Sequence, residues 1–207
     1  QAGKPWGMDR PATAPLPATR IAAEADLLLD ESLVQNLQAA FGFYLDRKMY
    51  DDIVDLFSDD TIIDIAAVGQ FRGKDGVRGA LASFGEAGLK TGELNDRPQL
   101  MPVITLAADG RSAQLRNIEI GMTGQHSGET YWSATIQNFT FRKGADGVWR
   151  IATLERYPRM RATYADGWQK PLPPALPQPL ACGPLRPAAH RRDQVADMGC
   201  GPHPIVC

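Results

Sequence analysis

The stretch from Tyr44 to Asp60 constrains the fold more than any other part of this sequence. It contains the end of one amphipathic helix and nearly all of a second, and it leads into a β-branched strand over residues 61–67. In both helices apolar side chains recur every three or four positions, which places them on one face. Asp46 lies at the join between the two apolar faces. Its carboxyl group is therefore either a helix cap or a group held at the mouth of a pocket.

The rest of the chain supplies the surface that these helices cover. We expect the first helix within residues 24–47, starting near Asp30 or Glu31, because carboxylates stabilise a helix N-terminus. Periodicity predicts a second helix over 50–57 and a third that starts at 74–76, followed by a loop at 85–98. Alternating apolar segments separated by turns then predict four strands, over residues 99–106, 112–122, 129–142 and 148–157.

Three helices followed by an antiparallel meander predict an α+β fold in which the helices cover one face of a curved sheet. We divide the chain into an extended arm (residues 1–29), one folded domain (30–168) and an irregular proline-rich tail (169–207). The tail cannot bury enough apolar surface to fold unassisted. It carries all the cysteines, whose spacing is not typical of a zinc site, at Cys182, Cys200 and Cys207.

Composition narrows the classes of partner. The 207 residues carry a net charge of −2 without a long run of one sign, which argues against nucleic acid and anionic membranes as partners. No apolar run reaches the ~20 residues that a membrane helix needs. The start at Gln1 suits the mature end left by a secretory signal. We therefore expect a periplasmic or secreted location, with a cytoplasmic one as the alternative.

A curved sheet covered by helices encloses an apolar hollow that suits a small molecule. Alternation nominates the side chains that face it. One face of the strand at 129–142 carries Trp132, Ile136 and Asn138, and one face of the strand at 148–157 carries Trp149, Glu155 and Tyr157. A carboxylate beside large aromatic side chains is either paired with an arginine or has a raised pKa.

Several motifs follow one another in an order that resembles a known family. The order resembles the SnoaL-like branch of the nuclear transport factor 2 (NTF2)-like superfamily, and it covers roughly residues 30–168. The motifs are Tyr44-Leu45-Asp46 with Tyr50-Asp51 and Leu56-Phe57-x-Asp59-Asp60, then the segments at 73–78, 99–104 and 109–113, and Asp146-Gly147-Val148-Trp149-Arg150-Ile151.

The resemblance implies an α+β cone with a deep pocket. The branch includes dehydratases, and lyases that act on diarylpropane diols, all without a metal or organic cofactor. It also implies a homo-oligomer, a trimer or a dimer. In the dehydratases an aspartate with a neighbouring tyrosine ends the first helix. Here Asp46 matches the aspartate, whereas Leu45 stands at the position of the tyrosine and the adjacent Tyr44 is expected to serve in its place. Asn138 matches the family asparagine, whereas the family histidine is replaced by Arg97.

This replacement changes the chemistry, because an arginine stays protonated and cannot shuttle a proton at neutral pH. Arg97 is instead expected to stabilise developing negative charge. Asp46 or Glu155 is expected to act as the general acid or base. Tyr44 and Asn138 would orient the substrate oxygen, and an aromatic substrate would pack against apolar and aromatic side chains, namely Trp132, Ile136, Trp149 and Tyr157.

The leading hypothesis is a cofactor-independent lyase that eliminates water or a one-carbon fragment from a small hydroxylated aromatic compound, such as a lignin-derived diarylpropane diol. One alternative is a non-catalytic module for small-molecule binding or assembly, and another is an isomerase or hydrolase on the same fold. His126 lies in a hairpin turn and is expected to be exposed. The acidic residues between Asp51 and Asp60 are interpreted as a solvated helix face rather than a metal site.

Overall fold

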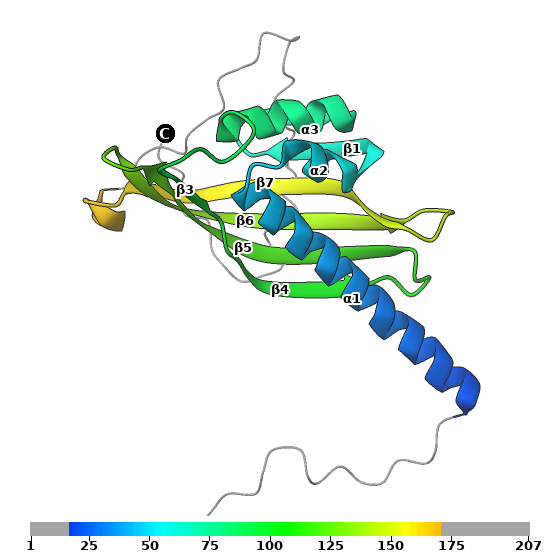
Figure 1. Ribbon diagram of the computed structural model, residues 1–207. Coiled ribbons are helices and arrows are strands. Elements are labelled where there is room, and N and C mark those ends of the chain that lie inside the picture. The colour runs from blue at the N-terminus through cyan, green and yellow to red at the C-terminus, as the bar shows by residue number, and fades with distance from the viewer. Residues whose placement is uncertain (1–16, 171–207) are drawn as a thin grey trace, which may run out of the picture.

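The computed structural model describes residues 17–170 of the chain. Three helices lie on one face of a seven-stranded sheet (Figure 1). They are α1 (Ala18–Asp46), α2 (Tyr50–Asp55) and α3 (Gly73–Leu81), with short 3-10 helices η1 (Ala82–Phe84) and η2 (Gly167–Gln169). The strands are β1 (Phe57–Ile65), β2 (Gly69–Arg72), β3 (Glu93–Asp96), β4 (Gln99–Leu106), β5 (Ser112–Gln125), β6 (Thr130–Lys143) and β7 (Trp149–Thr163).

The strands follow the order β2-β1-β7-β6-β5-β3, and β4 also pairs with β5. All pairings are antiparallel except that of β1 with β7. The predicted α+β class, with helices over one face of a curved and mostly antiparallel sheet, is therefore confirmed. The strand over 99–106 has the predicted bounds, whereas the predicted loop at 85–98 contains the additional strand β3.

Helix α1 starts earlier than predicted. It begins at Ala18, directly after Pro17, so residues 18–29 are helical rather than part of an extended arm. These residues are exposed and extend past the edge of the sheet (Figure 1). Their many alanines and leucines are strong helix formers, which outweighs the absence of a buried face. Residues 1–16 and 171–207, with the cysteines, His190 and His203, lie outside the described part of the chain.

Helix α1 defines which face of the sheet is internal. The Phe41 ring packs edge-on against Phe139 of β6, with 5.4 Å between ring centroids. Phe139 and Phe141 are buried, as is Gln137, so this phase of β6 forms the inner face beneath the helices. The alternate phase of each strand forms the outer face, away from the helices.

Within residues 17–170, no helix combines the length and the apolar character needed to cross a membrane.

Asp30 attaches α1 to the sheet where β6 ends and β7 begins. Its side chain accepts hydrogen bonds from Lys143 Nζ at 2.7 Å and from Trp149 Nε1 at 2.9 Å, and the residue is only 6% exposed. Burial by itself raises the pKa of this carboxyl, but the bonds from Lys143 and Trp149 and the charge of Lys143 hold it below its usual 3.8. Asp30 is thus an internal clamp, not the start of the helix.

We expect Asp30→Ala to lower the free energy of unfolding at neutral pH by about 2–3 kcal/mol, because hydrogen bonds to a charged group are lost. Glu31→Ala, which removes the exposed neighbouring carboxyl, is the matched control and should change little. Because the folded pKa of Asp30 is depressed, its contribution is present above the unfolded pKa and is lost as pH falls through the folded pKa. Urea unfolding at neutral and acidic pH measures both effects. Equal losses in the two variants would contradict the clamp.

Candidate active site

The C-terminal end of α1 is bound to the connection between β3 and β4. The Asn95 side-chain amide donates to the backbone carbonyls of Leu45 and Asp46, at 2.8 and 3.3 Å. The backbone N–H of Arg97 donates to Asp46 Oδ1 at 2.7 Å. The structure therefore brings together the two predicted site residues Asp46 and Arg97, at the polar end of the interior.

A buried charge cluster lies next to this contact, and we define it as Arg97, Glu119 and Arg156. Glu119 is fully buried, and its Oε1 accepts hydrogen bonds from Arg97 Nη1 at 3.1 Å and from Arg156 Nη2 at 2.8 Å. Its Oε2 accepts from the side-chain amides of Gln137 at 2.7 Å and Gln99 at 3.4 Å. Two guanidinium groups and one carboxylate leave the cluster with one excess positive charge.

The pKa values divide the carboxyl groups between two roles. Burial by itself raises the pKa of Glu119, but the charges and hydrogen bonds around it, led by Arg156 and Arg97, hold it below 4.5, so Glu119 is ionised. Burial raises the pKa of Asp46, as do the nearby carboxylates of Asp96 and Glu119, and the opposing effect of Arg97 is smaller. Asp46 therefore exchanges its proton at higher pH than an ordinary aspartate, as a general acid or base requires.

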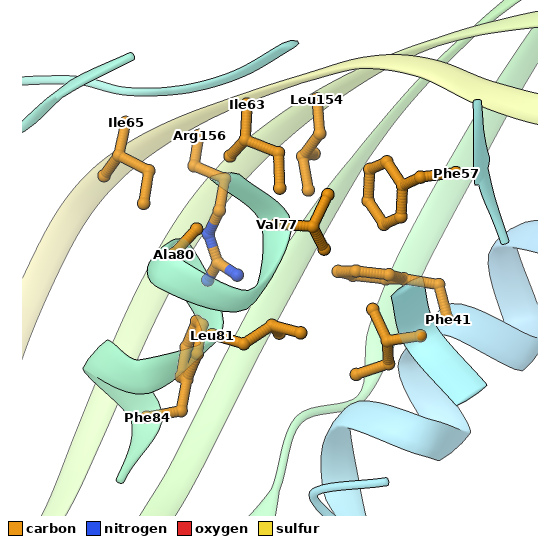
Figure 2. Close-up of a pocket in the computed structure, with 11 residues that line it drawn as sticks. Phe41, Phe57, Ile63, Ile65, Val77, Ala80, Leu81, Phe84, Leu154 and Arg156 are labelled. Carbon is orange, nitrogen blue, oxygen red and sulfur yellow. The ribbon is translucent and has the colours of Figure 1, made fainter. Parts of the chain in front are cut away.

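The hollow beneath α3 is almost filled with side chains. Its cavity volume is about 10 Å³, which is room for about one water molecule. Arg156 is the charged side chain among the 11 residues drawn around it, and its guanidinium group points toward Phe84 (Figure 2). The deep pocket that the resemblance implied is thus closed in this structure by the packed side chains that line it, Phe84 among them.

Glu155 does not belong to this site, because β7 contains a bulge. The pairing of β6 with β7 passes from Phe141↔Ile151 to Thr140↔Thr153, which leaves Ala152 as an extra residue. An extra residue reverses the alternation of the side chains beyond it. Leu154 and Arg156 therefore face inward, whereas Glu155 and Tyr157 face outward. The prediction that Glu155 faces the interior hollow is wrong.

The outer face also carries the predicted site residues of β6. Asn138, Ile136 and Trp132 alternate with the buried Gln137 and Phe139 and so point away from the helices. On that face the side-chain amide of Asn138 donates to Glu155 Oε2 at 3.3 Å, as does the Tyr157 hydroxyl at 3.1 Å. Trp132 stacks on Tyr164 with 6.1 Å between ring centroids.

Two further predicted residues are internal but do not contact the charge cluster. Trp149 precedes the bulge and faces inward, where it donates to Asp30. Asp30 and Asp46 are 16 residues apart in α1, which separates them by about 24 Å along the helix axis. Tyr44 is half-buried and packs against the hydrophobic core. The tyrosine nearer the charges is Tyr50, whose pKa is raised to about 12, chiefly by burial.

Sequence reasoning missed Glu119, Arg156, Phe84 and Tyr50. One signal was present in the strand at 112–122, where Leu115, Asn117 and Glu119 share a phase with Ala113. A carboxyl in the same phase as apolar residues indicates a buried and paired charge. Among residues 17–170, no three His, Cys, Asp or Glu side chains gather in an arrangement that could hold a metal ion.

Helices over one face of an open curved sheet, with polar side chains inside, define the cone of the NTF2-like fold. The model of the SnoaL-like domain matches residues 26–155. The chain belongs to this SnoaL-like family. No curated protein sequence matches it.

Solved structures share the fold at low sequence identity. The hexachlorocyclohexane dehydrochlorinase LinA-type3 from Novosphingobium barchaimii LL02 is 12% identical, with a TM-score of 0.59 over 69% of this chain and 94% of its own. An NTF2-like protein with a cystatin-like fold from Novosphingobium aromaticivorans is 19% identical, with a TM-score of 0.52 over 72% and 90%. A protein assigned as a scytalone dehydratase from Novosphingobium aromaticivorans DSM 12444 is 15% identical, with a TM-score of 0.55 over 68% and 91%. At these identities the likeness shows the fold alone.

We expect Glu119→Gln to lower the free energy of unfolding by roughly 3–5 kcal/mol, because it leaves two buried guanidinium groups without a counter-charge. Asp60→Asn, which removes the exposed partner of Arg142, is the control and should change little. Chemical denaturation followed by circular dichroism measures both. If Glu119→Gln unfolded at the wild-type denaturant concentration, the charge cluster would not be what holds these strands together.

Proposed function

We propose that this protein is a cofactor-independent lyase that eliminates water or a one-carbon fragment from a small hydroxylated aromatic compound, such as a lignin-derived diarylpropane diol. One observation carries the proposal: Asp46, a carboxyl with a raised pKa, is hydrogen-bonded to Arg97 at the edge of a buried cluster with excess positive charge. A proton-exchanging group beside fixed cations is what an elimination without a cofactor needs.

For the loss of water, the ionised Asp46 takes a proton from the carbon next to the one that bears the hydroxyl group. The C–H electron pair passes into the conjugated system, and the negative charge gathers on a conjugated oxygen held by Arg97 and Arg156. The C–O bond then breaks as a C=C bond forms. The departing hydroxide receives the proton from Asp46 and leaves as water, so the carboxylate is regenerated.

The same groups serve the loss of a one-carbon fragment. The benzylic hydroxyl group of the phenol first leaves as water with the phenolic proton, which gives a quinone methide. Asp46 then takes the proton of the terminal hydroxymethyl group, the C–C bond breaks, and formaldehyde leaves. The electron pair passes into the quinone methide, whose oxygen becomes a phenolate and receives the proton back from Asp46. Two proteins of similar structure, one named a dehydrochlorinase and the other a scytalone dehydratase, also support elimination as the class of reaction.

We expect Asp46→Asn to reduce turnover of such a diol by about 10²–10⁴-fold, the usual contribution of a positioned acid or base. Ligand affinity should change little, because the side chain keeps its size. In the wild type, kcat/KM should rise as the pH rises through the pKa of Asp46, which is raised above 3.8. This rise should be absent from the pH profile of the variant. Mass spectrometry of the products and calorimetry of binding measure the two properties.

Asp55→Asn, on the exposed side of α2, is the control for a general change in charge. Turnover that survives in Asp46→Asn, or a wild type that converts no hydroxylated aromatic compound in a panel of diols, would refute the lyase.

A second candidate function is an assembly module, and the outer face of the sheet favours it. Strand β4 exposes Met101 and Val103, at 68% and 65%. A row of paired residues crosses the outer face from β1 to β5. Its β1 and β7 end carries the acidic Asp64 and Glu155, and its β5 end carries Arg116. A two-fold axis through this face would place each end against its opposite charge. We therefore propose a second copy of this chain as the occupant.

Arg116→Glu should convert such an oligomer to a monomer, because the row would then carry one sign of charge. Adding Glu155→Arg should restore the oligomer. Arg78→Glu, on the helical layer, is the matched control and should leave the mass unchanged. Light scattering after gel filtration gives the mass of each variant, and a monomeric wild type would rule out this interface.

A further inference from the structure

The ring of Phe84 lies against both arginines of the charge cluster. The guanidinium carbon of Arg97 is 4.6 Å from the ring centroid, and that of Arg156 is 4.9 Å. Both guanidinium groups are held by the same oxygen of Glu119, so their positions do not depend on Phe84. The cluster is therefore a preformed surface for an aromatic ring, which the ring quadrupole makes favourable.

The surroundings of Phe84 suit the rest of a small aromatic molecule. Beside the ring lies the apolar cavity lined by Phe41, Val77, Leu81 and Leu154 (Figure 2). Removing the Phe84 ring would join its volume to this cavity. The cavity itself is only about 10 Å³, so the ring of a ligand would take the place of the Phe84 ring. The excess positive charge of the cluster adds a preference for an anionic or hydroxyl oxygen on that ring.

Phe84 comes from a weakly attached part of the chain. It is the last residue of η1, and the following Gly85 has φ +97°, a conformation that L side chains rarely adopt. The exposed loop at 85–92 is fastened to the domain by the hydrogen bond from the Tyr50 hydroxyl to the Gly85 carbonyl, at 3.2 Å, and by that from Gly88 N–H to the Lys48 carbonyl, at 3.0 Å. At its far end the His126 N–H donates to the Gly92 carbonyl at 2.7 Å. A loop with few attachments and a glycine beside the ring can swing outward at small cost.

We propose that Phe84 is a built-in plug that occupies the place of the substrate ring, and that the ligand is a planar aromatic compound with a phenolate or carboxylate oxygen. Such a ligand displaces Phe84 from Arg97 and Arg156 and places its oxygen against them. This inference rests on the proposed function, because it names the substrate class of the same site. It also explains how a closed interior receives a reactant.

The test is calorimetric binding of 4-hydroxybenzoate, with cyclohexanecarboxylate as a probe that has a similar ring size and a carboxylate but no π-system. In Phe84→Ala the aromatic probe should bind about 10-fold or more tightly than in the wild type, because the closed state no longer competes. The alicyclic probe should gain much less. Phe43→Ala, an exposed aromatic residue of α1, is the matched control and should leave both affinities unchanged.

Tyr50→Phe provides a second route in case Phe84→Ala does not fold. It removes the hydroxyl that holds Gly85 and should speed association of the aromatic probe several-fold in stopped-flow measurements. The plug is overturned if the folded Phe84→Ala binds both probes equally or no better than the wild type. If Phe84→Ala does not fold, an unchanged association rate in Tyr50→Phe overturns it.

These outcomes separate the plug from the lyase. Tighter aromatic binding by Phe84→Ala in a protein without turnover would keep the binding site and refute the lyase. Turnover that depends on Asp46, together with unchanged aromatic binding in Phe84→Ala, would keep the lyase and refute the plug.

Discussion

Glu119 is fully buried, and its two oxygens accept hydrogen bonds from side chains that come from separate parts of the sheet, namely Arg97, Gln99, Gln137 and Arg156. A buried carboxylate is tolerated only when it is paired and hydrogen-bonded, so β4, β5, β6 and β7 must come together around it. The same pairing fixes two cations within the interior. One residue therefore links the assembly of the sheet to the electrostatics of the candidate site.

The interior of the cone is divided along helix α1. Phe139, Phe141 and Trp149 form an apolar part of the interior beneath the helix, whereas the part near Asp46 is polar. The helix is fastened at two places, by the clamp at Asp30 and by the Asn95 amide at its end. Asp46 is thus positioned by a long packed element, which gives a site more precision than a loop does. The proposed plug, in contrast, belongs to a short 3-10 helix that is followed by an exposed loop.

The sequence was sufficient for the fold class because the signals were local. Helical periodicity and Asp-Gly turns found three helices and the strand over 99–106, and the motif order identified the family. Asp46 and Arg97 could be nominated because they flank element ends; they are in contact in the structure, and their catalytic roles stay a prediction. The clamp at Asp30 and the long start of α1 were missed, since no local rule tells a buried aspartate from a capping one. Glu155 was misplaced for a different reason: alternation holds only while the register is unbroken, and the bulge at Ala152 is set by pairing with β6.

The bulge at Ala152 decides which of the two adjacent charged residues of β7 faces the interior. Glu155 and Arg156 are adjacent, and only the present register turns the arginine toward Glu119. A slip of one residue would exchange them and set two carboxylates face to face in a medium that screens them poorly. Adjacent residues of opposite charge therefore make a one-residue shift in strand register unfavourable. The penalty is far larger than it would be with apolar side chains at both positions. A single-residue insertion or deletion between Ala152 and Arg156 would carry the same penalty, because it would turn Glu155 instead of Arg156 toward Glu119.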